Sequence, residues 1–221
     1  MRNIFLRATK STLERRRVLD MKKFLVLLIA VSSYAYADSA ALDNFLSNAK
    51  TMKADFTQTV VTGKKTRTTH GTMEIMRPNK FRWEYTEDKQ LIVSDASKIY
   101  IYDQPLQQVT VKALGSSIDK SPAAVLAGAN NIKSLYKITS VADKGDGLNW
   151  VKIEPKAAND NNGFQTVLMG FDSKQNLSSM QFIDNFGNQS TLKFSNLQTG
   201  ITIPANDFKF KAPAGVDVVE Q

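Results

Sequence analysis

The chain has 221 residues, no cysteine, one histidine and a formal net charge of +8 at pH 7, with 29 basic and 21 acidic side chains. The absence of cysteine excludes disulfides, and one histidine leaves too few ligands for an ordinary zinc site. The positive charge is concentrated in residues 1–37, which hold eight basic and two acidic side chains. The rest of the chain has a net charge of only +2, so composition does not favour nucleic-acid binding.

The beginning of the chain has the order of a secretory signal peptide. Lysines after Met21 precede a short apolar run at 24–31, and Ala35 and Ala37 form a small-x-small cleavage site. The apolar run is too short to span a membrane. We therefore expect an upstream extension at 1–20, a signal peptide at 21–37 and a single domain at 38–221.

Helical periodicity is confined to three short segments. Residues 38–52 predict a helix with an apolar stripe that includes Leu42, Phe45 and Leu46. Such a stripe usually packs into a core, and the alternative is a helix that lies over a cavity and can lift. Capping signals predict two further short helices at 121–128 and 131–136, which are too apolar to stand free and must lie on a sheet.

Alternation of apolar and polar residues predicts strands through the rest of the chain. The short turns between them favour antiparallel neighbours, and a sheet of about ten or eleven strands must curl. The predicted fold is therefore mainly β with short α-helices: a strongly curled antiparallel sheet with three helices over its concave side. The strands are expected at 54–62, 66–76, 81–85, 90–93, 97–102, 108–112, 138–141, 150–154, 166–171, 179–184 and 190–197, with further alternation at Phe208 and Phe210.

The segment 76–85 is the most informative part of the chain. Pro78 cannot lie inside a strand ladder and predicts a hairpin corner. After the corner, Phe81, Trp83 and Tyr85 alternate with charged residues, which is typical of a strand with one apolar face. Three large aromatic side chains on one face are expected to cover either a core or a ligand.

Catalytic chemistry is not supported by the sequence. His70 lies in a threonine-rich strand without an acid motif beside it, so a hydrogen-bonded strand histidine is the favoured interpretation. No glycine-rich phosphate loop occurs, and no metal or cofactor site is predicted. The turn carboxylates favour local backbone bonds, although a hydrolase that uses them is a rival interpretation. We expect a binding protein rather than an enzyme.

The predicted concave face suits a flexible apolar ligand. Methionine side chains adapt to ligands of variable shape, and each buried CH₂ contributes about 0.8 kcal/mol. The alternative is that the same residues only form the core beneath the helices. The candidate lining residues are Met73, Phe81, Trp83, Tyr85, Met169, Met180 and Phe182.

Several motifs resemble the LolA family of periplasmic outer-membrane lipoprotein carriers. They are residues 54–58, 76–85, 91–95, 99–103 and 208–216. The resemblance implies an unclosed β-barrel whose helices form a lid over a hydrophobic cavity. It also implies a periplasmic monomer that takes acylated lipoproteins from an inner-membrane ABC transporter to the outer-membrane receptor LolB. The receptor is itself a lipoprotein, and this chain has no cysteine to acylate, so it resembles the soluble carrier.

The resemblance also implies roles for two residues. Arg77 matches the arginine that holds the lid closed through hydrogen bonds to helix backbone, and the alternative is a surface arginine at a hairpin corner. Phe81 matches a rim phenylalanine associated with handover of the ligand, and the alternative is a core aromatic. A lipid-binding or lipid-sensing module of the same fold, which does not carry lipoproteins, is the alternative function.

Overall fold

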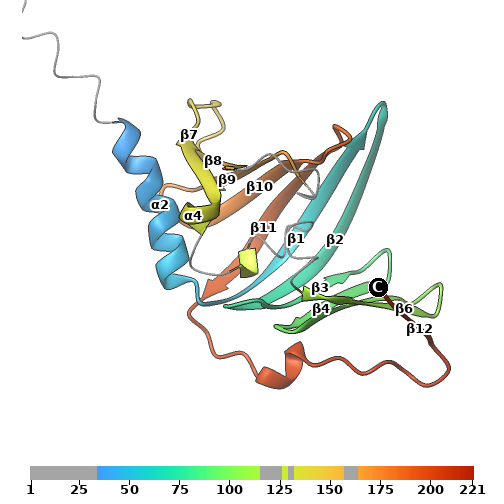
Figure 1. Cartoon of the computed structure of the whole chain (residues 1–221). Coiled ribbons are helices and arrows are strands. Elements are labelled where there is room, and N and C mark those ends of the chain that lie inside the picture. The colour runs from blue at the N-terminus through green and yellow to red at the C-terminus, as the bar shows by residue number, and fades with distance from the viewer. Residues whose placement is uncertain (1–33, 115–125, 129–131, 157–163) are drawn as a thin grey trace, which may run out of the picture. The chain divides into compact units, whose positions relative to one another are not determined.

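A twelve-stranded sheet forms the framework of this computed structural model, which describes residues 34–114, 126–128, 132–156 and 164–221 (Figure 1). The chain divides into two units, Met1–Ala37 and Asp38–Gln221. The predicted extension at 1–20 and most of the predicted signal peptide lie outside the described residues. The strands are β1 Thr51–Thr62, β2 Lys65–Met76, β3 Lys80–Tyr85, β4 Gln90–Asp95, β5 Lys98–Asp103, β6 Gln108–Ala113, β7 Tyr136–Ser140, β8 Asn149–Pro155, β9 Thr166–Phe171, β10 Leu177–Ile183, β11 Gln189–Thr199 and β12 Asp217–Glu220.

The sheet consists of two meanders joined at one central pair. The strand order in the sheet is β12-β6-β5-β4-β3-β2-β1-β11-β10-β9-β8-β7. The central pair is β1 with β11, and each half of the sheet extends outward from it in a meander. The end strands β12 and β7 have no hydrogen bonds to each other, so the barrel is not closed. The predicted mainly β fold with an unclosed, curled sheet is therefore confirmed. All the strands that the sequence predicts pair antiparallel, and one further strand that it does not predict, β12, runs parallel to β6 at the edge of the sheet.

Among the described residues, three helical segments lie on the concave side of the sheet (Figure 1). They are α2 Tyr34–Asn48, α4 Ile132–Leu135 and a helical turn at Leu126 and Ala127. The first predicted helix extends too far, because Met52 already pairs with Ile75 of β2. The last one also does, because Tyr136 begins β7 and pairs with Pro155. Most of the predicted helix at 121–128 lies outside the described residues.

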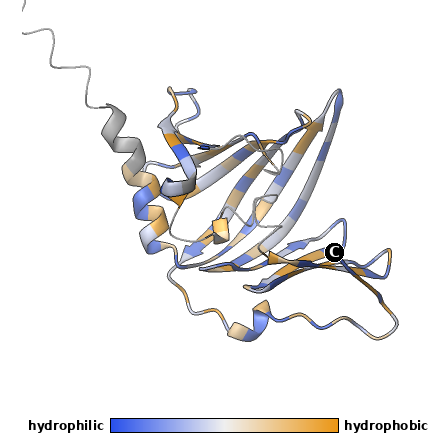
Figure 2. Cartoon of the chain, in the orientation of Figure 1, coloured by the Kyte–Doolittle hydropathy of each residue, from blue (hydrophilic) through white to orange (hydrophobic). Residues whose placement is uncertain are grey.

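The main core lies between the concave face and these helices. Hydrophobic and hydrophilic residues alternate along the strands (Figure 2), so one face of each strand contributes to this core. Leu42 and Phe45 of α2, together with Leu126, belong to the same buried cluster as Met73 and Phe81 of the sheet. The helices are therefore held on the sheet mainly by apolar packing.

A second, smaller core covers the convex face near the β12 edge. Tyr102, Val109 and Val111 are buried there, and Phe210 packs against them. The prediction that the strand at 97–102 is covered on both faces is confirmed, since Ile99 lies in the main core. The alternation at Phe208 and Phe210 does not correspond to a strand. Phe208 ends the 3₁₀ helix η3 Ala205–Phe208, which lies against β3 and β4.

Candidate functional site

Arg77 connects the corner between β2 and β3 to two helical segments. Its Nε donates a hydrogen bond to the carbonyl of Leu126 at 2.7 Å, and its Nη1 donates to the carbonyl of Leu46 at 3.2 Å. The guanidinium carbon also lies 4.9 Å from the centre of the Phe45 ring. Carbonyls near helix ends lack partners within the helix, so a forked donor can satisfy two of them at once. One side chain thus contacts both α2 and the helical turn at 126–127.

The electrostatics of Arg77 are those of a partly buried cation bound to neutral acceptors. Burial lowers the pKa of Arg77 to about 10, so the side chain stays protonated at neutral pH. Within the described part of the chain, its contacts are carbonyl oxygens and a ring rather than a carboxylate, and Nη2 has no partner. Hydrogen bonds from a charged donor to carbonyls are stronger than neutral ones but lack the attraction of a full ion pair.

The backbone of the same corner makes further contacts to the helical segments. The amide of Arg77 donates to the carbonyl of Lys50 at 2.8 Å, just after α2. The amide of Asn79 donates to the carbonyl of Ala127 at 2.7 Å, and the Ser94 hydroxyl donates to the carbonyl of Asn79 at 2.7 Å. These bonds join the corner to the residue just after α2, to the turn at 126–127 and to β4.

The predicted lining residues come from two parts of the sheet. Met73 pairs in register with Trp83 across β2 and β3, and Met169 pairs with Met180 across β9 and β10. Strands β1 and β11 lie between the two groups. All seven residues, with Phe81, Tyr85 and Phe182 completing the set, belong to or pack against one core cluster. In this state the apolar face is covered by protein.

Two residues of β1 complete the face and were not among the predicted site residues. The Phe56 ring centre lies 4.7 Å from that of Trp83 and 5.2 Å from that of Tyr85. The Tyr85 hydroxyl donates to Oε1 of Gln58 at 2.7 Å, and burial raises the pKa of Tyr85 to about 12. The period-2 alternation along β1 identified Phe56 as a strand residue, but only the pairing of β1 with β2 brings it to the aromatic group.

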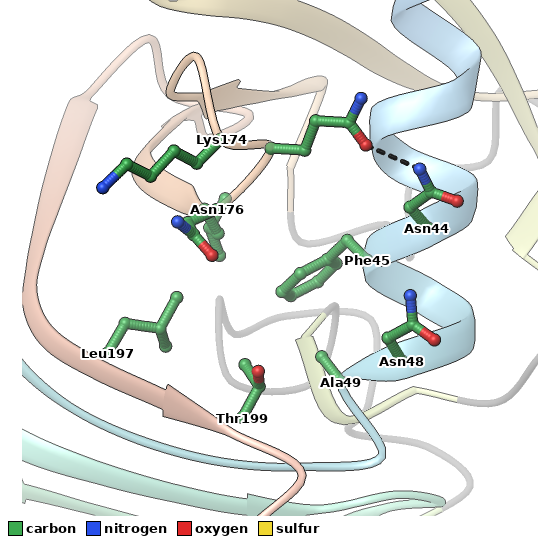
Figure 3. Close-up of a pocket in the computed structure, with 10 residues that line it drawn as sticks. Asn44, Phe45, Asn48, Ala49, Lys174, Asn176, Leu197 and Thr199 are labelled. Carbon is green, nitrogen blue, oxygen red and sulfur yellow. Dashed lines mark hydrogen bonds between the residues drawn. The ribbon is translucent and has the colours of Figure 1, made fainter.

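A pocket of about 240 Å³ lies beside α2, between the helix and the β9–β10 turn (Figure 3). Two of its lining residues form a hydrogen bond, in which Asn44 donates to Oε1 of Gln175 at 2.6 Å and joins the helix to the turn. The predicted lining residues do not contribute to it. Its walls are Asn44, Phe45, Asn48, Ala49, Lys174, Gln175, Asn176, Leu177, Leu197 and Thr199.

His70 is a hydrogen-bonded strand residue. Its Nδ1 lies 2.7 Å from Oε1 of Glu87, and its backbone amide donates to Oε2 of the same carboxylate at 2.7 Å. These contacts connect β2 to the turn after β3. Among the described residues, no group of three or more histidine, cysteine, aspartate or glutamate side chains is placed to hold a metal ion.

The Glu87 contacts predict a defined pH dependence of stability. Hydrogen bonds from His70 lower the pKa of Glu87 from 4.5 to about 2. A depressed carboxyl pKa stabilises the fold above pH 4.5, and the contribution is lost as pH falls toward about 2. Glu87→Gln is therefore expected to lower the thermal midpoint slightly at neutral pH. The difference from the unaltered protein should shrink between pH 4.5 and 2 in melting curves, and a constant difference across that window would contradict the assignment.

Comparison with known proteins finds relatives over most of the chain. A protein from Chromobacterium violaceum named outer-membrane lipoprotein carrier protein is 45% identical over 181 residues, covering 81% of this chain and 86% of the relative. A protein of the same name from Nitrosospira multiformis is 38% identical over 201 residues, covering 90% and 96%. A solved structure of an uncharacterized conserved protein from Thermus thermophilus has a TM-score of 0.52 at 11% identity, over 83% of this chain and 98% of its own. That likeness concerns the fold alone.

The open sheet with helices over an apolar concave face defines a class of unclosed β-barrel proteins. Within that class, residues 47–211 match the family described as outer membrane lipoprotein carrier protein LolA. The chain belongs to the LolA family. In the described part of the chain, none of the helices has the length and apolar character needed to cross a bilayer.

Proposed function

We propose that this protein is a periplasmic carrier that binds acylated lipoproteins and shields their acyl chains from water. It accepts them from an inner-membrane ABC transporter and delivers them to an outer-membrane receptor, LolB. The relatives named outer-membrane lipoprotein carrier protein support the activity. The single structural observation that carries the proposal is the contact of Arg77 with both helical segments over the apolar face.

In the proposed mechanism, the acyl chains replace the helical segments that pack on the apolar face. In the described state, α2 and the turn at 126–127 pack on Met73, Phe81 and their neighbours. Acyl chains that displace these segments bury the same face, and each buried CH₂ contributes about 0.8 kcal/mol. The displaced helical segments lose apolar contacts with this face that are comparable to those the acyl chains gain. The net free energy of binding is therefore smaller than the burial of the acyl chains alone, which permits release to a receptor.

Arg77 sets the balance between the closed and the loaded states. Its hydrogen bonds to Leu46 and Leu126 exist only while both segments lie on the corner. They stabilise the closed state and so compete with the ligand. Phe81 lies next to this corner, two strand positions before Trp83 and on the same face. In the proposed cycle it contributes to transfer of the lipoprotein at the rim of the apolar face.

The proposed carrier works as a monomer and without covalent chemistry. Binding, shielding and release require only apolar contacts and the breaking and re-forming of hydrogen bonds. No cofactor enters the proposed cycle.

The test is release of lipoproteins from spheroplasts whose own carrier has been depleted. Purified residues 38–221 are expected to bring outer-membrane-directed lipoproteins into the supernatant as a soluble one-to-one complex. Failure to release them, with folded protein and a compatible transporter present, would contradict the carrier function. Lipid binding that persists under those conditions would instead favour a lipid-binding or lipid-sensing module.

A further inference from the structure

Trp83 carries a buried hydrogen-bond donor that the fold does not use. Its side chain is 2% exposed, and among the described residues its indole Nε1 has no hydrogen-bond partner. Buried tryptophan N–H groups usually find an acceptor, because an unpaired buried donor destabilises a fold. Trp150 follows the usual pattern, with its Nε1 donating to Oδ2 of Asp146 at 2.9 Å.

The unpaired donor lies in the middle of the apolar face. The Phe56 ring packs against the indole, and Met73 lies opposite Trp83 on β2. The Trp83 N–H lies close enough to the Tyr85 hydroxyl to lower the pKa of Tyr85, against the larger effect of burial. It nevertheless does not form a hydrogen bond of normal geometry with that oxygen. The Tyr85 proton is already donated to Gln58. The face thus presents one free N–H and, beside it, one paired hydroxyl.

The chemistry of this position selects a neutral acceptor. The charged residues of β3, Lys80, Arg82 and Glu84, alternate with Trp83 onto the opposite face, and Arg82 pairs with Glu84 at 3.1 Å. Within the described part of the chain, the contacts of Trp83 include no cation that could pair with an anionic headgroup, and a plain hydrocarbon would leave the N–H unpaired. An ester carbonyl has an acceptor oxygen, no donor and no charge, and it loses its water when it enters an apolar site.

We propose that Trp83 Nε1 donates a hydrogen bond to an ester carbonyl oxygen of the bound acyl chains. The Tyr85–Gln58 pair lies on the side of Trp83 away from the Arg77 corner and supplies a second polar contact. This inference rests on the proposed carrier function, since the lid must leave the face before an ester reaches Trp83. The carrier would then recognise the ester linkage between acyl chain and glycerol as well as the apolar chain itself.

The test compares two ligands on two proteins. The ligands are a dipalmitoylglyceryl-cysteine lipopeptide and its dihexadecyl ether analogue, which keeps the chains but lacks the ester carbonyls. Trp83→Phe keeps an aromatic ring and removes the N–H. We expect it to weaken binding of the ester lipopeptide about fivefold more than binding of the ether analogue, as for loss of one hydrogen bond. Trp150→Phe is the matched control and should weaken neither ligand.

A second measurement needs no variant. The chain has two tryptophans, so a ¹⁵N spectrum shows two indole N–H signals, and Trp150 serves as an internal reference. The ester lipopeptide is expected to move the Trp83 signal downfield from its position in the ether complex. Equal weakening of both ligands by Trp83→Phe, or the same Trp83 signal in both complexes, would overturn the proposal.

A third arm separates the possible sources of the ester. An ester phospholipid and its ether analogue are compared in the same way. An ester effect with the lipopeptide, with or without one for the phospholipid, supports recognition of the cargo. An ester effect confined to the phospholipid would overturn it. Binding of both lipopeptides without any ester effect would leave the carrier function intact and remove only the role of Trp83.

Discussion

Replacement of Arg77 by leucine is expected to reduce lipoprotein transfer to the receptor by at least about tenfold while the sheet stays folded. The change removes two hydrogen bonds from a charged donor, to Leu46 and to Leu126. Such bonds contribute about 1.5–3 kcal/mol each, and 1.4 kcal/mol is a factor of ten in an equilibrium. The closed state then competes less well with the acyl chains, so the variant should retain its cargo.

The measurement is transfer of a purified carrier–lipoprotein complex to the receptor, with circular dichroism to establish folding. Arg82→Leu is the matched control. Arg82 lies on the opposite face of β3 and pairs with Glu84, away from the helical segments. We expect the control to transfer at the normal rate. Normal transfer by Arg77→Leu, or equal loss in both variants, would contradict the role of Arg77 as a lid contact.

Replacement of Gly71 by valine is expected to have the largest effect on stability. A Cβ at this position would clash with the carbonyl oxygen of Glu84 and would lie 2.5 Å from Cζ of Phe56. The first atom belongs to the backbone of β3 and the second to a ring packed against Trp83 and Tyr85. Neither moves without disturbing the β2–β3 pairing or the aromatic group. Overpacking typically costs about 1–3 kcal/mol, and a clash with backbone belongs at the upper end of that range.

Urea unfolding at equilibrium measures the loss. Thr72→Val is the matched control, because it introduces valine at the next position of β2. That position is exposed and lies on the other face of the strand. The control should stay within about 0.5 kcal/mol of the unaltered protein. A loss of less than about 1 kcal/mol in Gly71→Val would show that the ring and the strand adjust more easily than the close distances imply.

The same close approach explains why the aromatic group forms where it does. Gly71 pairs with Phe56 on one side and with Tyr85 on the other. Without a side chain between them, the rings of β1 and β3 meet across β2 over the glycine backbone. The sequence pattern placed Phe81, Trp83 and Tyr85 on one face, but it contained no sign that Phe56 would stack there.

Local alternation was sufficient to predict most of the fold. The strands at 81–85 and 166–171, the corner at Pro78 and the double covering of the strand at 97–102 all follow from residues near one another in the chain. The physical reason is that a strand's two faces are determined by period-2 patterning, and a short turn leaves few alternatives to antiparallel pairing. The resemblance to the LolA family rested partly on the same strands, through the motifs at 76–85 and 99–103.

Contacts between distant residues were decided only by the tertiary structure. Arg77 reaches the carbonyls of residues 31 and 49 positions away in the chain, and a side chain's partner at that distance leaves no local pattern. The same holds for the parallel addition of β12 to β6. It also holds for Phe208, whose alternation with Phe210 resembled a strand although the segment covers the sheet instead. Amino-acid alternation determines which face of a strand is apolar, whereas the packing of the whole chain determines what covers that face.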